Sequence, residues 1–315
     1  MISAADDSQR VPLIVDIKRF SLEDGPGIRT VAFFKGCPLR CVFCQNPETQ
    51  NIFVEARFSQ RRCIRCGACQ TACVRGAISF PWFRLFRRRR NEALCAFCGQ
   101  CEAACPRSAT KIVGNRYSIE ELSTLLLKDA SFFSNSGGGI TLSGGECLLF
   151  LDYVSALLKN LKINNVHTLI QTAGLFCFED FAEKVLPHVD MIYFDIKFVD
   201  DVLHKKFTHV SNQVILGNFG KLAAAAPGKL QARIPLIPGM TATKENLRAI
   251  TALLHRHNIN SVSLLPYNPG GIEKSIELGR PSPKITKRFM TPNELLTAKM
   301  YRNEPPHAVT RQITN

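Results

Sequence analysis

Three shortages narrow the class of protein that this sequence can encode. Its 315 residues contain no uninterrupted apolar run of about 18, the length that a membrane-spanning helix needs. The opening segment, MISAADDSQRVPLIVDIKRF, carries acids where a secretory signal peptide would carry its basic region. Charged residues make up only 21% of the chain and apolar residues 45%, which excludes disorder of the whole chain. We expect a cytoplasmic protein, with no membrane partner, that has one large core and room for a small appended module.

Acidic residues are also scarce. The chain has 26 Asp and Glu against 40 Lys and Arg, a formal net charge of +14 that would suit an acidic partner or a nucleic acid. The densest basic segment contains Arg84 and Arg87 to Arg90, beside Trp82, Phe83 and Phe86. An isolated charge run is usually a solvated loop, and the neighbouring aromatic side chains suit packing better than base stacking. We therefore predict no nucleic-acid function, while a protein-docking patch at the arginines stays open.

Cysteine, by contrast, is abundant, with 13 residues. A cytoplasmic setting disfavours disulfides, so the spacing of these residues was compared with that of metal sites. Two runs share the spacing C-x2-C-x2-C-x3-C, the first at Cys63, Cys66, Cys69 and Cys73 and the second at Cys95, Cys98, Cys101 and Cys105. In bacterial two-cluster ferredoxins, the fourth cysteine of such a run binds the other run's cluster. The spacing therefore predicts two four-iron clusters; zinc, which favours pairs separated by a longer loop, is the weaker alternative.

A third group of cysteines lies in the segment FFKGCPLRCVFCQNPE. Its members are Cys37, Cys41 and Cys44. Three thiolates can hold three irons of a cubane cluster and leave the fourth iron open for another ligand. Two cysteines remain, and either could in principle be that ligand. Cys147 would compete with the loop it belongs to, and Cys177, beside two phenylalanines, is expected to be buried, so we favour neither.

Six short β-rich segments recur along the rest of the chain. They lie at residues 30–36, 139–145, 167–174, 190–198, 231–239 and 261–268, with helical patterns between most of them. One helix is marked by Ser118 and Glu121 as a capping box. This alternation predicts parallel strands joined by crossovers, and six units are too few for a closed eight-stranded barrel. The predicted fold is α/β: a partial (βα)6 TIM-like barrel with an inserted ferredoxin-like domain.

This interpretation divides the chain into four parts. They are residues 1–53, the start of the barrel with the three-cysteine loop; 54–113, the insert; 114–270, the rest of the barrel; and 271–315, a tail rich in Pro, Gly and charge that should be irregular. The short motifs SGGE, QTAG, DIK and IPG each follow a predicted strand. Since the carboxyl ends of parallel strands share one face, these motifs should meet the three-cysteine loop at the barrel mouth.

Together these motifs resemble the radical S-adenosylmethionine (SAM) enzymes and, within them, the glycyl-radical enzyme activating enzymes. The similarity is carried by DGPGIRTVAFFKGCPLRCVFCQNPE (24–48), NSGGGITLSGGE (135–146), DIKFVDDVLHKKFT (195–208), ARIPLIPG (232–239) and LLPYN (264–268). An insert with two ferredoxin-type cysteine runs resembles that of the subgroup that activates decarboxylases, dehydratases, lyases and arylsuccinate synthases. The segments VPLIVDIKRFSLEDGPGIRT and FFSNSGGGITLSGG look closest to those of arylsuccinate synthase activators, followed by those of arylacetate decarboxylase activators.

The resemblance also implies cofactors and site residues. Its cofactors would be SAM, bound to the open iron through its amino and carboxylate groups, and three 4Fe-4S clusters. The implied SAM contacts are Phe43 near the adenine, Ser143, Gly144, Gly145 and Glu146 around the methionyl ammonium, and Asp195, Lys197 and Arg233 at the charged and ribosyl parts. A reduced flavodoxin or ferredoxin would supply the electron that cleaves SAM to a 5′-deoxyadenosyl radical. That radical would take hydrogen from a glycine of a partner enzyme, with no catalytic side-chain acid or base.

The chain departs from the family pattern at three positions. Gln171 stands where an acid is common, Cys147 where a proline often follows SGGE, and His209 where a glycine is expected. A lone histidine on a helix is more often a surface residue than a ligand, so His209 is expected at the surface. Two rival functions remain: a radical SAM enzyme acting on a small molecule or another peptide, and a pure iron–sulfur electron-transfer protein.

Overall fold

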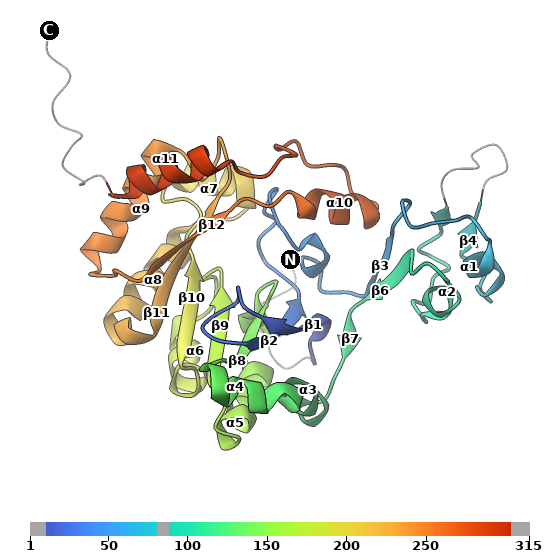
Figure 1. Ribbon diagram of the computed structural model, residues 1–315, viewed down its shortest axis with the longest axis horizontal. Helices are drawn as coiled ribbons and strands as arrows, with labels where there is room; N and C mark the ends of the chain where they lie inside the picture. Colours follow the sequence, from blue (N-terminus) through green and yellow to red (C-terminus); the bar gives the residue numbers. More distant parts are fainter. Residues whose placement is uncertain (1–10, 81–87, 304–315) are drawn as a thin grey trace, which may run out of the picture.

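The computed structural model describes residues 11–80 and 88–303, so Trp82, Phe83, Arg84, Phe86 and Arg87 lie outside the described residues. Its main feature is an eight-stranded sheet (Figure 1). From one edge to the other the strands are β12 (Val262–Pro266), β11 (Leu230–Leu236), β10 (Met191–Asp195), β9 (Thr168–Thr172), β8 (Gly139–Gly144), β2 (Arg29–Lys35), β1 (Leu13–Ser21) and β7 (Asn115–Arg116). The first six are parallel to one another, and β1 and β7 are antiparallel to their neighbours. The six predicted parallel strands are confirmed.

Helices connect the parallel strands, as the alternating pattern predicted. Outside the insert the connecting helices are α3 (Ile119–Leu126), α4 (Ala130–Ser136), α5 (Leu151–Ile163), α6 (Phe178–Lys184), α7 (Asp201–Thr208), α8 (Gln213–Ala225) and α9 (Lys244–Arg256). Two more helices, α10 (Gly270–Glu277) and α11 (Pro292–Asn303), follow the last strand. The capping box of Ser118 and Glu121 begins α3, and the Asp200 and Thr243 side chains cap α7 and α9. Among the described helices, none has the length and apolar character needed to cross a membrane.

Strand β1 was not predicted. It extends the sheet beyond β2, and its first residues, Leu13, Ile14 and Val15, are buried in the core. Its second half is polar, and its pairing with β2 is irregular between Lys18 and Ser21. A bulge of this kind breaks the two-residue alternation of side chains, which is the signal by which a strand is recognised in a sequence.

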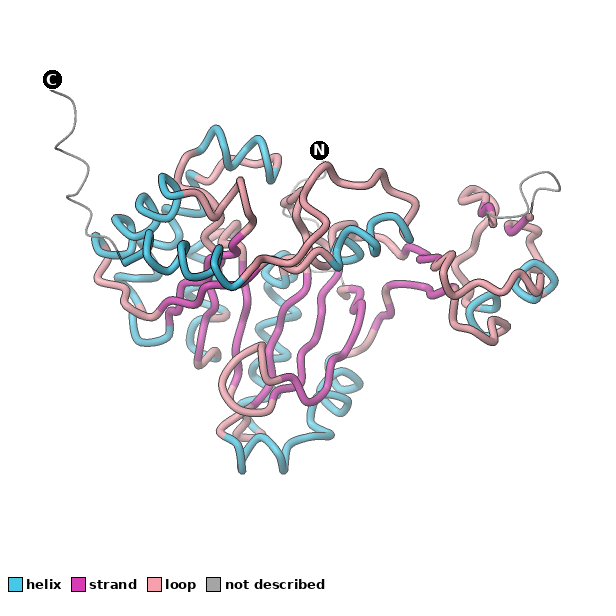
Figure 2. The backbone as a smooth tube through the Cα atoms, turned by 45° about the horizontal axis from the view of Figure 1, so that its top comes forward, coloured by secondary structure: helices cyan, strands magenta, loops and turns pink. Residues whose placement is uncertain are grey.

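The insert leaves the sheet after β2 and returns through β7. Its elements are β3 (Glu55–Phe58), α1 (Ala68–Thr71), β4 (Ile78–Ser79), β5 (Arg89–Arg90), α2 (Gln100–Ala103) and β6 (Thr110–Val113). Figure 2 shows it set to one side, joined to the rest of the molecule beside the antiparallel pair β3 and β6. The two short helices are equivalent, since each begins after a glycine in the left-handed region, Gly67 at φ 77° and Gly99 at φ 80°. The domain boundaries given above stay a proposal.

The segment after residue 270, expected to be irregular, is helical in large part, and this expectation was wrong for its described residues. Helix α10 packs on the three-cysteine loop so closely that a Cβ at Gly271 would lie 2.0 Å from the carbonyl oxygen of Cys44. Helix α11 packs on α9 and buries Ala298. Gly271 stands near the start of α10 because backbone meets backbone there, a tertiary reason that local propensity does not reveal.

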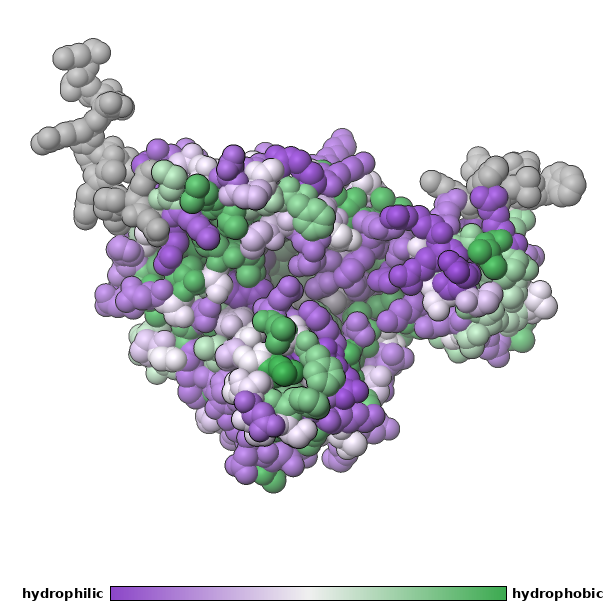
Figure 3. All heavy atoms as spheres, viewed as in Figure 1, coloured by the Kyte–Doolittle hydropathy of each residue, from purple (hydrophilic) through white to green (hydrophobic). Residues whose placement is uncertain are grey.

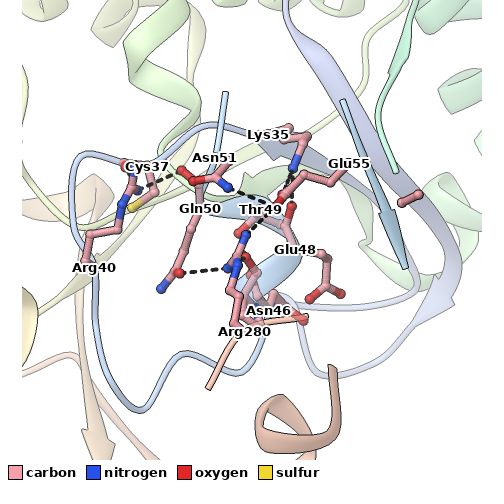
Figure 4. A network of polar contacts seen from close by, with 12 residues as sticks. Lys35, Cys37, Arg40, Asn46, Glu48, Thr49, Gln50, Asn51, Glu55 and Arg280 are labelled. Carbon is pink, nitrogen blue, oxygen red and sulfur yellow. Dashed lines mark hydrogen bonds and ion pairs between the residues drawn. The ribbon is translucent and has the colours of Figure 1, made fainter. Parts of the chain in front are cut away.

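A buried ion pair joins the barrel to the insert. The Lys35 ammonium, at the end of β2, donates to Glu55 Oε2 and to the Glu48 carbonyl, both at 2.6 Å, and the lysine side chain is 0% exposed. Glu55 begins β3, and its other oxygen accepts from Arg280 at 2.7 Å (Figure 4). Figure 3 shows hydrophilic side chains gathered on the viewed face where the insert meets the barrel. Three segments distant in sequence are thus held by one carboxylate.

We expect Glu55→Gln to lower the free energy of unfolding by about 3 kcal/mol, because it leaves the buried Lys35 charge without its main counter-charge. Guanidinium unfolding of the anaerobically reconstituted protein, followed by circular dichroism, measures the change. Glu179→Gln is the matched control, since it breaks an ion pair with Lys221 whose side chains are both more than half exposed. Equal unfolding midpoints for the two variants would contradict the prediction.

Candidate active site

A cavity of about 210 Å³ opens at the carboxyl ends of the parallel strands. It is lined by the three cysteines of the loop after β2 and by seven of the eight predicted SAM contacts, namely Phe43, Ser143, Gly144, Gly145, Asp195, Lys197 and Arg233. Strand pairing explains the gathering, because Ser143 lies opposite Phe33 of β2 and Asp195 opposite Arg233 of β11. Motifs spread over 200 residues of sequence therefore face one space, as the fold predicted.

Backbone hydrogen bonds fix the three-cysteine loop. Gly36 N–H donates to the Thr49 carbonyl at 2.7 Å, and the N–H groups of Arg40 and Val42 donate to the carbonyls of Thr208 and Phe207 at 2.8 and 3.0 Å. The last turn of α7 therefore holds the middle of the loop with carbonyls that the helix leaves unpaired. Sequence reasoning missed this role, although the matching DIKFVDDVLHKKFT segment ends at these residues.

The three thiols lie where the proton is hard to lose. Burial raises the pKa of Cys37, Cys41 and Cys44, with a further contribution from neighbouring thiols at Cys37 and Cys44, and the pKa of Cys44 reaches about 12. Thiolates at these positions need a strong positive partner such as iron, whose binding would release the protons. The donor set fits an iron–sulfur cluster.

The two glycines of SGGE are required by the fold itself. A Cβ at Gly144, where φ is 106°, would lie 2.4 Å from the backbone nitrogen and oxygen of Phe34, and one at Gly145 would lie 2.1 Å from the Gly36 carbonyl oxygen. We predicted these glycines for close approach to a ligand. The structure adds that they let the loop after β8 lie directly against the loop after β2.

Glu146 is the one predicted SAM contact that does not line the cavity, and its predicted position requires correction. The side chain is 0% exposed, and its carboxylate accepts from the N–H of Leu148 at 3.3 Å and of Ala173 at 2.8 Å, and from the Thr172 hydroxyl at 2.9 Å. The carboxylate thus joins the loops after β8 and β9 behind the cavity wall. Burial raises the pKa of Glu146 to about 7 despite these hydrogen bonds.

Asp195, Lys197 and Arg233 form the charged wall of the cavity. Arg233 Nε lies 3.6 Å from Asp195 Oδ1, and Lys197 Nζ lies 3.5 Å from Asp195 Oδ2. Burial opposes the charge of Lys197, but the acidic groups of Asp195, Cys41 and Cys37 outweigh it and raise its pKa. Asp195 Oδ1 and the Nε and Nη1 atoms of Arg233 are buried without a hydrogen-bond partner among the described residues. Such atoms demand partners, and a ligand with carboxylate, amino and hydroxyl groups would supply them.

An apolar wall faces the charged one. Phe43 is 8% exposed and packs in a small cluster with Phe198, Ile237 and Tyr267. Its ring lies 6.5 Å from that of Phe198. This surface suits a flat aromatic group, as predicted for adenine.

The insert contains two cavities that sort its eight cysteines. One, of about 20 Å³, is lined by Cys63, Cys66, Cys69 and Cys105, and the other, of about 30 Å³, by Cys73, Cys95, Cys98 and Cys101. Each run thus gives its first three cysteines to one cavity and its fourth to the other, as the ferredoxin spacing predicted. Backbone N–H groups of Ala77 and Ala109 donate to Sγ of Cys73 and Cys105, which are the fourth cysteines of the two runs.

The described arginines of the basic run are packed more closely than a solvated loop would be. The Arg88 guanidinium lies 4.3 Å above the Phe58 ring and donates to the Thr110 hydroxyl at 2.7 Å, and Arg90 donates to the Ala56 carbonyl at 3.0 Å. Arg89 is exposed. The loop interpretation was therefore wrong for Arg88 and Arg90, which stabilise the insert.

The remaining predictions have mixed outcomes. His209 is exposed, as expected, and ends α7 in the left-handed conformation at φ 66°, which explains why glycine suits this position.

Cys147 is fully buried and Cys177 is exposed, and neither lines the cavity of the three-cysteine loop. The expected burial of Cys177 was wrong because this residue stands directly before α6 and its phenylalanine neighbours, rather than its thiol, pack inward.

Helix α10 and the segment just after it add residues that sequence reasoning missed. Lys274 donates to Asn46 Oδ1 at 2.7 Å and pairs with Glu48 at 2.8 Å, and Arg280 donates to the Pro47 carbonyl at 2.6 Å. Figure 4 shows Arg280 pointing into the segment that follows the third cysteine. Asn46, which had no assigned role, therefore links the cavity wall to α10.

Comparison with known proteins agrees with this geometry. Residues 62–109 match the 4Fe-4S dicluster domain and residues 90–254 the radical SAM superfamily. The chain is 40% identical over 266 residues to the trans-4-hydroxy-L-proline dehydratase activating enzyme of Clostridioides difficile, covering 84% of this chain and 86% of the relative. It is 38% identical over 287 residues to the isethionate sulfite-lyase activating enzyme of Nitratidesulfovibrio vulgaris, covering 90% and 92%. It is also 37% identical over 283 residues to the benzylsuccinate synthase activating enzyme of Thauera aromatica, covering 86% and 83%.

The chain therefore belongs to the radical SAM superfamily and, within it, to the glycyl-radical enzyme activating enzymes. The resemblance inferred from the sequence is confirmed, as is the prediction of a radical SAM oxidoreductase with an α/β fold and a dicluster ferredoxin-type region.

The cavities of the insert predict how paired cysteine substitutions behave. Cys66→Ala with Cys105→Ala removes two ligands from one cavity and should cost about four irons per chain, whereas Cys66→Ala with Cys73→Ala damages both cavities and should cost about eight. Iron analysis after anaerobic reconstitution measures both. The two losses would be exchanged if each run held its own cluster.

The buried carboxyl of Glu146 predicts a pH dependence. Its pKa is raised from 4.5 to about 7, so the folded state binds the proton more tightly and the contribution of this group to stability falls as pH rises from about 4.5 to 7. Relative to Glu146→Gln, the unfolding free energy of the wild type should fall by up to about 3 kcal/mol over that interval. Denaturant unfolding at several pH values tests this, with the exposed Glu120→Gln as control; parallel curves for wild type and Glu146→Gln would refute it.

Proposed function

We propose that this chain activates a glycyl-radical enzyme by reductive cleavage of SAM. The observation that carries the proposal is one cavity that is lined by the three cysteines and by Asp195 and Arg233, whose buried polar atoms lack hydrogen-bond partners among the described residues. Thiolates suit iron, and the unpaired atoms suit a ligand with carboxylate, amino and hydroxyl groups. SAM has all three groups, together with an adenine that fits the apolar wall at Phe43.

The proposed chemistry needs few side chains. When bound, the reduced cluster supplies one electron to the sulfonium of SAM, whose carbon–sulfur bond breaks to give methionine and a 5′-deoxyadenosyl radical. Cys37, Cys41 and Cys44 would hold that cluster. Arg233 and Asp195 orient the charged and hydroxyl groups of SAM, and the walls of the cavity exclude water. The radical takes a hydrogen atom from a glycine α-carbon, which leaves 5′-deoxyadenosine and a glycyl radical.

The eight cysteines of the insert hold two further clusters under this proposal, which makes three 4Fe-4S clusters in all. Their pairing in two cavities supports a ferredoxin-like module able to pass electrons from a reduced flavodoxin or ferredoxin toward the SAM site. The Lys35 and Glu55 contact supports a fixed attachment of this module to the barrel.

The partner protein is a glycyl-radical enzyme, and we propose an arylsuccinate synthase or an arylacetate decarboxylase. The 37% identity to a benzylsuccinate synthase activating enzyme supports the first, and the 33% identity to the indoleacetate decarboxylase activating enzyme of Tractidigestivibacter scatoligenes supports the second. Activators named for other partners are slightly more similar, at 40% and 38% identity, so activation assays with purified partners decide the choice.

The test is electron paramagnetic resonance of the anaerobically reconstituted, reduced protein with and without SAM, together with iron counting and an assay for 5′-deoxyadenosine. We expect about twelve irons per chain, a cubane signal that shifts on addition of SAM, and 5′-deoxyadenosine release. Cys41→Ala should lose the shift and the product, and Cys177→Ala, at an exposed cysteine outside every cluster cavity described here, should keep both. About eight irons with no shift and no cleavage would favour the electron-transfer alternative.

A further inference from the structure

The lead-in segment DGPGIR folds back beneath the cavity. The Asp24 carbonyl accepts from the Thr141 hydroxyl at 2.8 Å, and that hydroxyl accepts from Nε of the fully buried Arg29 at 2.6 Å. A Cβ at Gly25 would lie 2.5 Å from the Arg29 side chain, and one at Gly27 would lie 2.4 Å from the Gly138 nitrogen. The segment therefore fits only with glycines at these positions, and it sets Asp24 firmly against β8 and β9.

A chain of hydrogen bonds leads from Asp24 to the cavity. Gln171 Nε2 donates to Asp24 Oδ1 at 3.3 Å, and Gln171 Oε1 accepts from the Ser143 hydroxyl at 2.6 Å. Both Gln171 and Ser143 line the cavity. The other carboxylate oxygen of Asp24 accepts from the Ser21 hydroxyl at 2.6 Å and lies 3.5 Å from the Lys18 ammonium, so donors surround this group.

The direction of this chain is fixed at its Asp24 end. A carboxylate only accepts hydrogen bonds, so the amide of Gln171 must turn its NH2 toward Asp24 and its oxygen toward Ser143. The hydroxyl of Ser143 must then donate its hydrogen to Gln171. What Ser143 presents to the cavity is an oxygen with free lone pairs, which accepts from N–H donors and repels acceptors.

We propose that Asp24, acting through Gln171, is a positioning residue that fixes the Ser143 hydroxyl as an acceptor for the amino group of SAM. This inference rests on the proposed function. It also gives the amino group a hydrogen-bond partner in place of Glu146, whose carboxylate lies behind the cavity wall. Gln171 suits this arrangement because its amide donates to Asp24 at one atom and accepts from Ser143 at the other, which a carboxylate could not do.

The test compares the affinity of the reconstituted full chain for SAM with its affinity for the analogue in which hydrogen replaces the amino group. Anaerobic calorimetry measures both dissociation constants, and the ratio of the constant for the analogue to that for SAM reports the contacts of the amino group. The analogue also loses the contact between the amino group and iron, but this loss is common to all variants. Asp24→Asn lets the Gln171 amide turn over, and should reduce the ratio about fivefold to tenfold, the worth of one hydrogen bond. Ser143→Ala should do the same without disturbing the lead-in segment.

Two further variants test whether the direction of the hydrogen bonds between Asp24, Gln171 and Ser143 matters, rather than only the packing of these side chains. Lys18→Gln removes the exposed ion pair of Asp24 and should leave the ratio unchanged. The exchange Asp24→Asn with Gln171→Glu puts the donor at position 24 and the acceptor at 171, so Ser143 again donates and the ratio should recover.

The inference fails if Ser143→Ala keeps the wild-type ratio, if Lys18→Gln lowers the ratio as much as Asp24→Asn, or if the exchange does not restore it. These outcomes differ from failure of the proposed function, in which the wild-type chain neither binds SAM nor releases 5′-deoxyadenosine.

Discussion

The active site depends on a contact between two backbones, where the loop after β2 meets the loop after β8 with no side chain between them. Glu146 N–H donates to the Gly36 carbonyl at 2.7 Å, and Gly36 N–H donates to the Thr49 carbonyl at 2.7 Å. A Cβ at Gly145 would push the loop after β8 away from the loop after β2. The cysteine loop, the SGG turn and the segment after the third cysteine consequently form one rigid unit, and the geometry of the cavity follows from it.

Strand β2 carries a buried cation at each end, and the two organise opposite sides of the site. Arg29 at its start holds the lead-in segment under the cavity through Thr141, and burial lowers its pKa to about 10, which leaves it charged at neutral pH. Lys35 at its end holds the first strand of the insert through Glu55. Buried charges are costly unless paired or hydrogen-bonded, so each cation specifies the position of the segment that satisfies it.

Local signals in the sequence predicted most of the fold and the grouping of the cysteines around three cavities. Strand alternation, the Ser118 cap and cysteine spacing act over a few residues, and the structure follows them. Failures occurred where the cause lies far along the chain. The orientation of Glu146 is set by donors on the loop after β9, the start of α10 by the Cys44 carbonyl, and the packing of Arg88 by Phe58. The composition of one segment does not reveal these partners, because they lie in other parts of the chain.

The contacts of α10 also fix an order of events during synthesis. All eight cysteines that line the two cavities of the insert lie between residues 63 and 105, so they have been synthesised when about a third of the chain has been made. The three-cysteine loop, by contrast, receives its contacts from Gly271, Lys274 and Arg280 only when the chain has been made as far as these residues. The ribosome thus delivers all eight cysteines of the insert well before the three-cysteine loop has its complete surroundings.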